Sequence, residues 1–165
     1  MCRIFTIVVV FLFSISFPAW NADSSPLKAD KILVEKSRRQ LTLIYQGQTV
    51  KTYAISLGPN PVGHKQQEGD GRTPEGTYRI DYRNPHSAFH LSLHISYPNA
   101  SDRADAKKRG AKPGGNIFLH GGSSPSSIVM PETRDWTLGC IAVTHSEIEE
   151  IWKAVVDGTV IEIRP

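Results

Sequence analysis

The sequence contains little cysteine, and this scarcity limits how the chain can be held together. Only two of its 165 residues are cysteines, Cys2 and Cys140. Cys2 precedes an apolar run that is typical of an export signal, so removal of that segment would leave Cys140 alone. A lone thiol in an exported protein has no disulfide partner within its own chain. We therefore expect Cys140 to be either an inert buried side chain or a reactive one.

The sequence also lacks an apolar run long enough to cross a bilayer comfortably. The run at residues 4–17 is interrupted by one threonine and two serines, and a spanning helix needs roughly 20 apolar residues. A basic residue precedes the run and small residues follow it, so segment 1–24 is typical of a signal peptide. The alternative is an uncleaved N-terminal anchor, which would be the protein's only membrane contact. In both cases we expect an exported protein of the periplasm or cell envelope.

The chain has no strong charge imbalance, no internal repeat and no low-complexity segment. Its 19 basic and 16 acidic residues give a formal net charge of +3. The only compact basic run, Lys107–Arg109, is typical of a solvated helix or loop. We therefore expect no nucleic-acid partner, because such proteins carry a basic patch or stripe. The residues after the signal suffice for one domain, at 30–165.

Most of this domain shows the alternation of apolar and polar residues that is typical of β-strands. Strands are predicted in a hairpin at 31–57 and at 77–82, 90–95, 116–120, 141–143 and 159–163. A Gly- and Pro-rich loop is predicted at 58–71. A short surface helix is predicted at 102–109. The clearest helix begins after Thr144, where a capping box precedes an apolar stripe that runs to Val155. The prediction is a mostly β fold with one firm helix near the C-terminus.

His120 and Cys140 are candidates for a nucleophilic pair. A cysteine attacks as the thiolate, and a nearby imidazole can take the thiol proton and later protonate a leaving amine. His120 ends one predicted strand and Cys140 precedes another, so the two would meet at a sheet edge if these strands are neighbours. The amides of Gly139 and Cys140 could then donate to an oxyanion. The alternative is that both side chains only pack in the core.

Four separated segments resemble the L,D-transpeptidase catalytic domain, the YkuD-like family. In chain order they are the hairpin at 32–58, Gly69–Arg72 with the following Thr73–Tyr78, His120–Gly122, and Thr137–Ile141. The resemblance covers about residues 30 to 165. It implies that family's fold, with mixed β-sandwich or barrel-like sheets and one firm helix near the C-terminus.

The resemblance implies a two-step acyl transfer on the stem peptides of peptidoglycan. Cys140 would expel D-alanine from a tetrapeptide and hold the tripeptide as a thioester, and an amine of another stem or of a wall-attached protein would accept it. If water is the acceptor, the enzyme is an L,D-carboxypeptidase or releases a protein from the wall. An alternative of another class is a non-catalytic peptidoglycan-binding domain. Neither a metal nor an organic cofactor is implied.

The same resemblance suggests roles for individual residues. Many family members have a histidine two residues before the cysteine, where this chain has Leu138, so the general-base role falls on His120. The carbonyl of Gly121 or Gly122 would orient the imidazole. The candidates for substrate binding are Gly122, Thr137, Arg134, Trp136, His90 and Ser92.

The reasons for these substrate-binding candidates differ. Arg134 could present a cation to a substrate carboxylate and Trp136 an aromatic wall, or the two could simply form a salt bridge and a packing contact. His90 and Ser92 would share one face of a strand and line a groove. Histidines at 86, 90 and 94 would form a metal-binding face only on a helix, and the surrounding alternation favours a strand.

Overall fold

The computed structural model describes residues 26–122 and 135–165. The elements in chain order are β1 (Lys31–Glu35), β2 (Gln40–Tyr45), β3 (Gln48–Ala54), β4 (Gly76–Ser87), β5 (His90–Ile95), α1 (Ala100–Lys108), β6 (Phe118–His120), β7 (Ile141–Ala142), α2 (His145–Ala154) and β8 (Val160–Arg164). The predicted mostly β fold is confirmed. The proposed signal segment 1–24 lies outside the described residues.

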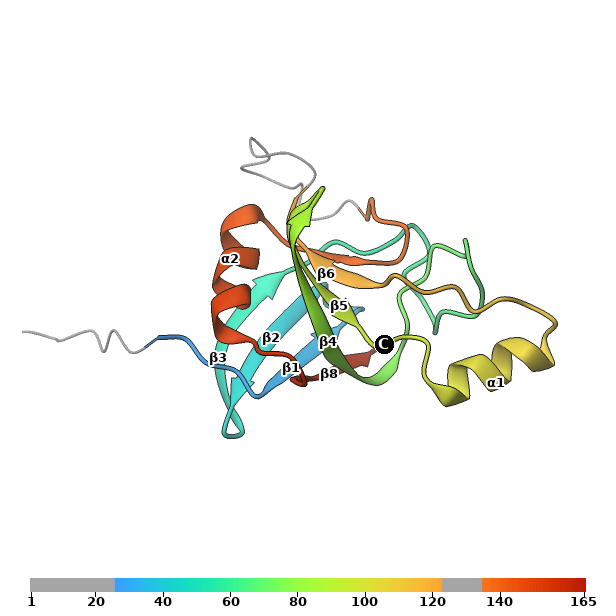
Figure 1. Ribbon diagram of the computed structural model, residues 1–165, viewed down its shortest axis with the longest axis horizontal. Coiled ribbons are helices and arrows are strands. Elements are labelled where there is room, and N and C mark those ends of the chain that lie inside the picture. The colour runs from blue at the N-terminus through green and yellow to red at the C-terminus, as the bar shows by residue number, and fades with distance from the viewer. Residues whose placement is uncertain (1–25, 123–134) are drawn as a thin grey trace, which may run out of the picture.

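The eight described strands form one strongly curved sheet, and a single isolated bridge links its two ends. Their order is β3-β2-β1-β8-β4-β5-β6-β7, in which β1 pairs with β8 and β6 with β7 in parallel. Just beyond β3, Ser56 exchanges two backbone hydrogen bonds with Ala142 of β7, each 2.9 Å long. The sheet is therefore a half-barrel (Figure 1), and the cysteine strand lies beside the end of the first hairpin.

The core fills the inside of this half-barrel. Apolar side chains alternate along the strands, and the inward-facing ones are fully buried, among them Ile32, Leu41, Leu43, Ile80, Leu93, Ile95 and Ile161. Helix α2 begins at the predicted capping box, in which Thr144 and Glu147 satisfy each other's backbone amides. Its buried residues Ile148 and Ile151 face the core cluster. Helix α1 projects from the opposite end of the molecule (Figure 1).

Two local predictions about the strands were wrong. The apolar pattern that predicts the first hairpin includes Tyr45 and Val50 on its buried face, but they are 37% and 39% exposed. The pairing of β2 with β3 skips Val50, so Val50 is the extra residue of a β-bulge. Tyr45 is the last residue of β2, at the tip of the hairpin. Strand β4 also continues to Ser87, beyond the predicted end at residue 82. This extension supplies part of the site described below.

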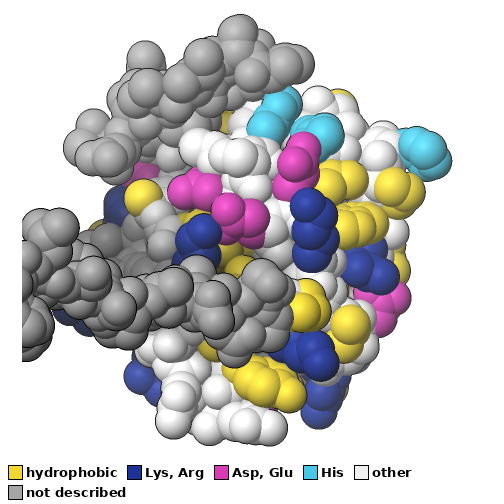
Figure 2. All heavy atoms as spheres, turned by 90° about the vertical axis from the view of Figure 1, so that its left-hand side faces the viewer, with side chains coloured by type: hydrophobic (Ala, Val, Ile, Leu, Met, Phe, Trp, Pro, Cys, Tyr) yellow, Lys and Arg dark blue, Asp and Glu magenta, His cyan; other side chains and the backbone are white. Residues whose placement is uncertain are grey.

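The surface that carries α2 and β3 is mixed in charge. Figure 2 shows basic and acidic side chains interspersed on the described part of this face, with no continuous basic stripe there. One cross-element example is the pair formed by Lys51 of β3 and Glu150 of α2. Among the described residues, no helix is long and apolar enough to span a membrane.

Candidate active site

Strand pairing brings His120 and Cys140 to one face of the sheet. β6 and β7 are parallel neighbours, with Leu119 opposite Ile141. Cys140 directly precedes β7 and is therefore level with Phe118, which shares a sheet face with His120 because alternate strand residues point the same way. Both His120 and Cys140 line a pocket of about 300 Å³. The condition for His120 and Cys140 to meet, that their strands are neighbours, is therefore met.

Aromatic rings enclose the imidazole of His120. The ring of Phe89 stacks on it with centroids 4.4 Å apart and an interplanar angle of 26°. The indole of Trp136 meets it edge-on at 5.6 Å, and only 3% of His120 is exposed. This burial lowers the pKa of His120, although the hydrogen bond to Gly121 acts in the opposite direction. The imidazole is therefore neutral at neutral pH.

The hydrogen bond of His120 fixes which ring nitrogen can act as a base. Its Nδ1 lies 2.7 Å from the carbonyl oxygen of Gly121. A carbonyl can only accept, so Nδ1 carries the proton and Nε2 keeps a lone pair. A Cβ at position 121 would lie 2.7 Å from the backbone oxygen of Phe89 and 3.0 Å from a ring carbon of His145. Only glycine fits between these groups.

The thiol of Cys140 is partly buried and protonated at rest. Its Sγ lies 3.6 Å from the carbonyl oxygen of Asn116. Burial raises the pKa of Cys140, while a backbone hydrogen bond at Phe118 and the positive charge of Lys65 partly offset this effect. The resting pair is therefore a neutral thiol with a neutral imidazole, and forming the thiolate requires a proton acceptor.

The turn at 137–140 is organised by Thr137, which is itself 4% exposed. Its hydroxyl donates to the carbonyl of Cys140 at 2.8 Å and accepts from the amide of Gly139 at 3.2 Å. Gly139 has φ +122°, and a Cβ there would lie 2.6 Å from the backbone oxygen of Arg72. Of the two amides predicted as oxyanion donors, that of Gly139 is thus engaged by Thr137. The Cys140 amide has no hydrogen-bond partner in the described part of the chain.

An ion pair ties this turn to the first hairpin. Asp135 accepts three hydrogen bonds from the guanidinium of Arg39, two from Nε at 3.0 and 3.2 Å and one from Nη2 at 2.6 Å. The same carboxylate accepts from the amide of Leu57 at 2.9 Å, and the carbonyl of Leu57 accepts from the amide of Thr137 at 3.0 Å. The position of the cysteine is therefore set by residues almost 100 positions earlier in the chain.

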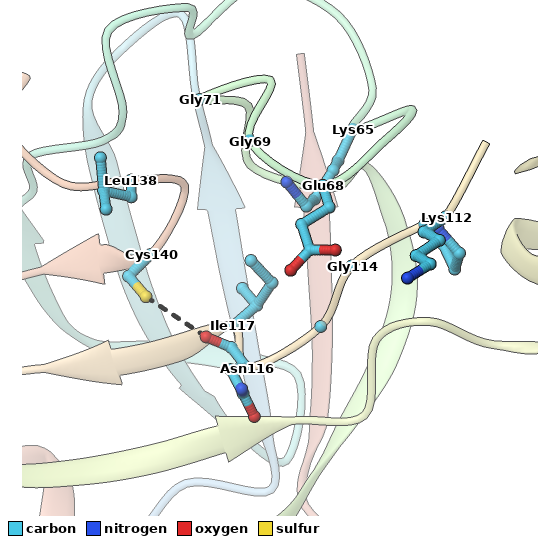
Figure 3. Close-up of a pocket in the computed structure, with 12 residues that line it drawn as sticks. Lys65, Glu68, Gly69, Gly71, Lys112, Gly114, Asn116, Ile117, Leu138 and Cys140 are labelled. Atoms are coloured by element: carbon cyan, nitrogen blue, oxygen red, sulfur yellow. Dashed lines mark hydrogen bonds between the residues drawn. The ribbon is translucent and has the colours of Figure 1, made fainter.

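A second and larger pocket also opens at Cys140. It has a volume of about 750 Å³, and its walls come from residues 65–71 and 112–117. Figure 3 shows Leu138 and Cys140 on one side of it and Glu68 and Lys112 on the other. Leu138 is 85% exposed. Glu68 and Lys112 are also exposed and form no ion pair within residues 26–122 and 135–165.

The remaining predicted site residues fall into separate places. Ser92 lies directly opposite His120 on β5 and lines the smaller pocket. His90 lines neither pocket, because its Nε2 lies 2.8 Å from a carboxylate oxygen of Glu149 in α2. The carbonyl of Gly122 accepts a hydrogen bond from Nε2 of His145 at 3.0 Å, which fixes the end of the His-Gly-Gly segment.

Trp136 and Arg134 were predicted as a pair beside the cysteine. Trp136 packs on His120 and Phe89, and neither pocket includes it among its lining residues. Its indole nitrogen is buried and has no hydrogen-bond partner among the described residues. Arg134 lies outside the described residues.

The sequence did not predict one wall of the smaller pocket. This wall comes from the extended end of β4 and the following turn, with Asn84, His86, Ser87, Ala88 and Phe89, and from Asn116. If the alternation of β4 is continued beyond residue 82, it predicts Asn84 and His86 on the same face as Tyr82. Nothing in the sequence marks Phe89. The described residues contain no group of three side chains that could hold a metal ion.

Comparison with known proteins agrees with this geometry. The family model of the L,D-transpeptidase catalytic domain, YkuD, matches residues 29–163. The chain therefore belongs to the YkuD family of L,D-transpeptidase catalytic domains, and the predicted resemblance is confirmed.

Individual relatives match over most of this chain. It is 29% identical over 135 residues to YafK of Escherichia coli K12, a candidate L,D-transpeptidase by name, with 78% of this chain and 48% of YafK covered. The helical cell shape determining protein Pgp2 of Campylobacter jejuni is 25% identical with a TM-score of 0.61, covering 81% of this chain and 46% of Pgp2. Bd1075 of Bdellovibrio bacteriovorus is 29% identical with a TM-score of 0.55, covering 80% and 46%. The chain spans about half the length of these relatives.

Proposed function

We propose that this protein is an L,D-transpeptidase that acts on peptidoglycan stem peptides, with Cys140 as the nucleophile and His120 as the general base. The substrate is a tetrapeptide stem, and the acceptor is an amine of a second stem or of a protein to be attached to the wall. Membership in the family supports the reaction class. The observation that carries the assignment of residues is the single pocket lined by both His120 and Cys140.

In the first step, Nε2 of His120 takes the thiol proton while Sγ attacks the carbonyl of the third stem residue. The amide of Cys140 stabilises the oxyanion of the tetrahedral intermediate. The intermediate collapses to a thioester, and His120 returns the proton to the amine of the departing D-alanine. The hydrogen bond to the Gly121 carbonyl keeps Nε2, and not Nδ1, free for both transfers.

In the second step, an amine attacks the thioester carbonyl and His120 takes one of its protons. The thiolate of Cys140 leaves and is reprotonated, and the new amide carries the tripeptide. The larger pocket also opens at Cys140, so an acceptor can approach the thioester through it.

The decisive experiment is mass spectrometry of disaccharide-tetrapeptide after incubation with the protein and, in parallel, with the Cys140→Ala variant. We expect a dimer that has lost one D-alanine in the first sample only, because the thioester cannot form without the thiol. Turnover by a folded Cys140→Ala variant would refute the proposal. Circular dichroism of both proteins would establish that the variant is folded.

The same experiment separates transfer from hydrolysis. A cysteine-dependent tripeptide without a dimer indicates L,D-carboxypeptidase activity. Release of a peptide-linked wall protein can be assayed in the same way with a protein-bearing muropeptide. Binding of wall fragments without any cysteine-dependent product would instead indicate a peptidoglycan-binding domain.

We also propose that segment 1–24 directs export to the periplasm or envelope, where the substrate is found. Cell fractionation followed by N-terminal sequencing tests this, and a protein retained in the cytoplasm would contradict it. Because the relative Pgp2 is described as determining helical cell shape, deletion of the gene is further expected to change cell morphology.

A further inference from the structure

A row of three aromatic rings crosses the sheet and ends at Cys140. In the strand register, Tyr82 of β4 is opposite His94 of β5, and His94 is opposite Phe118 of β6. Phe118 is in turn level with Cys140, as the pairing of β6 with β7 requires. The row Tyr82–His94–Phe118, here called the aromatic row, is therefore a continuous line of side chains on one face of the sheet.

The rings of the aromatic row contact one another. Tyr82 stacks on His94 with centroids 4.5 Å apart and an interplanar angle of 16°. Phe118 meets His94 edge-on at 4.8 Å. A hydrogen bond of 2.6 Å between His94 Nδ1 and Asp81 holds the central ring in place. The row is thus a preformed platform.

The aromatic row is continuous with the smaller pocket and more open at its far end. The next cross-strand row on the same face contains Ser92 and His120, and Phe118 lines the pocket together with Cys140. The side chain of His94 is 14% exposed, whereas Tyr82 is 45% exposed and is one of the few large apolar side chains open to solvent in the described residues. Part of the Tyr82 ring is therefore open to a ligand at the far end of the row.

A stem peptide is long enough to reach from Cys140 to Tyr82. The ring centroids of Tyr82 and Phe118 are 6.0 Å apart, and one step between neighbouring strands, about 4.8 Å, separates Phe118 from Cys140. The ring of Tyr82 is therefore within roughly 11 Å of Cys140. Three stem residues and the acid that joins them to the sugar span up to roughly 14 Å at about 3.4 Å per residue, so a stem whose third residue is at Cys140 can place its sugar near Tyr82.

The geometry points to Tyr82 as a contact for the pyranose ring that carries the stem peptide, with His94 and Phe118 supporting the peptide between that ring and Cys140. This inference rests on the proposed function. A pyranose presents one face of C–H groups, which suits the electron-rich face of a tyrosine ring. Asp81, next to Tyr82 and 43% exposed, can accept a hydrogen bond from a sugar hydroxyl.

Binding to the Cys140→Ala protein tests this inference without requiring turnover. Calorimetry gives the dissociation constants of disaccharide-tetrapeptide and of the free tetrapeptide with the same stem. We expect the sugar-bearing ligand to bind roughly 2- to 10-fold more tightly, the range that one aromatic contact supplies. Adding Tyr82→Ala should bring the ratio close to one, whereas Tyr82→Phe should preserve it because the ring remains.

The matched control is Tyr45→Ala. Tyr45 is similarly exposed, at 37%, but it lies at the tip of the first hairpin, so its removal should leave the ratio unchanged. Equal binding of the two ligands, or a ratio unaffected by Tyr82→Ala, would overturn the inference even if the enzyme turns the substrate over. If the Cys140→Ala protein shows a sugar preference that depends on Tyr82, while the protein with Cys140 intact converts neither ligand, the inference would be supported and the proposed reaction refuted.

Discussion

The two pockets that meet at Cys140 differ in what encloses them. The smaller one is bounded largely by strands and by the aromatic rings around His120. The larger one is bounded by loops that carry exposed charges, Glu68 and Lys112 among them. The first therefore surrounds His120 with aromatic side chains, and the second presents exposed charges. The two pockets share Asn116 and Cys140, so the proposed proton transfer and the proposed acceptor binding can be tested separately.

The largest expected effect is in the smaller pocket, from His120→Asn. Asparagine cannot take the thiol proton, and Cys140 has a raised pKa, so little thiolate would form at neutral pH. We expect kcat to fall by about 10²- to 10⁴-fold, the usual contribution of a general base. Steady-state kinetics on disaccharide-tetrapeptide gives this value, and thermal melting serves as the folding control. If the folded variant retains a tenth or more of the activity, His120 is not the general base and the smaller pocket does not have the role proposed for it.

The second prediction concerns the cysteine turn that both pockets share. Asp135→Ala removes the acceptor for Arg39 and leaves the Leu57 amide without its partner. We expect the free energy of unfolding to fall by about 1–3 kcal/mol, because charged hydrogen bonds are lost in a partly buried place. Urea titration measures this loss.

The control for the cysteine turn is Lys51→Ala. This change removes an ion pair with Glu150 whose two side chains are 44% and 42% exposed, and it keeps the hydrogen bond from Tyr53 to Glu150. Such exposed pairs usually contribute at most about 1 kcal/mol. If Asp135→Ala destabilises the protein no more than Lys51→Ala does, the contacts of Asp135 with the first hairpin do not stabilise the turn.

The contrast between the pockets also shows what the sequence could predict. Most of the strands and the capping box of α2 follow from local alternation and from short motifs, and the structure contains them. The structure also brings His120 and Cys140 to one pocket. The walls of both pockets do not follow from local alternation or from these motifs. They depend on the extension of β4, and on the closure between Ser56 and Ala142, which joins segments far apart in the chain.

Thr137 shows that a sequence motif does not predict the contacts of each of its side chains. Its place in the cysteine motif suggested a contact with substrate, but its hydroxyl is bonded to the backbone of residues 139 and 140. A motif shows which residues belong together, whereas the direction of each side chain depends on turn geometry. The turn here requires a positive φ at Gly139, which no pattern of apolar residues encodes.

The third prediction concerns the smaller pocket and is a shift in the pH profile of kcat/KM. Burial lowers the pKa of His120 from 6.5, so the neutral base persists to lower pH, and the acid limb of kcat/KM should have its midpoint below 6.5. Phe89→Ala removes the ring stacked on the imidazole and admits water. Water favours the charged form, so the pKa should rise and the acid limb should move to higher pH.

The control for this shift is Phe89→Leu, which keeps an apolar side chain over the imidazole and should leave the acid limb near its original position. The measurement is kcat/KM between pH 4.5 and 9, a range chosen around the ordinary value for histidine. An acid limb that stays in place in Phe89→Ala would mean that the aromatic enclosure does not set the protonation of His120.

The smallest expected effect is in the larger pocket. Lys112→Ala and Glu68→Ala each remove one exposed charge from the wall of the larger pocket, while His120 and its aromatic enclosure remain. Because solvent screens exposed charges, we expect KM for the acceptor to change by only about 2- to 5-fold, with kcat unchanged. Lys107→Ala, an exposed lysine on α1 outside both pockets, should leave both parameters unaltered. If Lys112→Ala lowers kcat as much as His120→Asn does, the smaller and the larger pocket are not functionally separate.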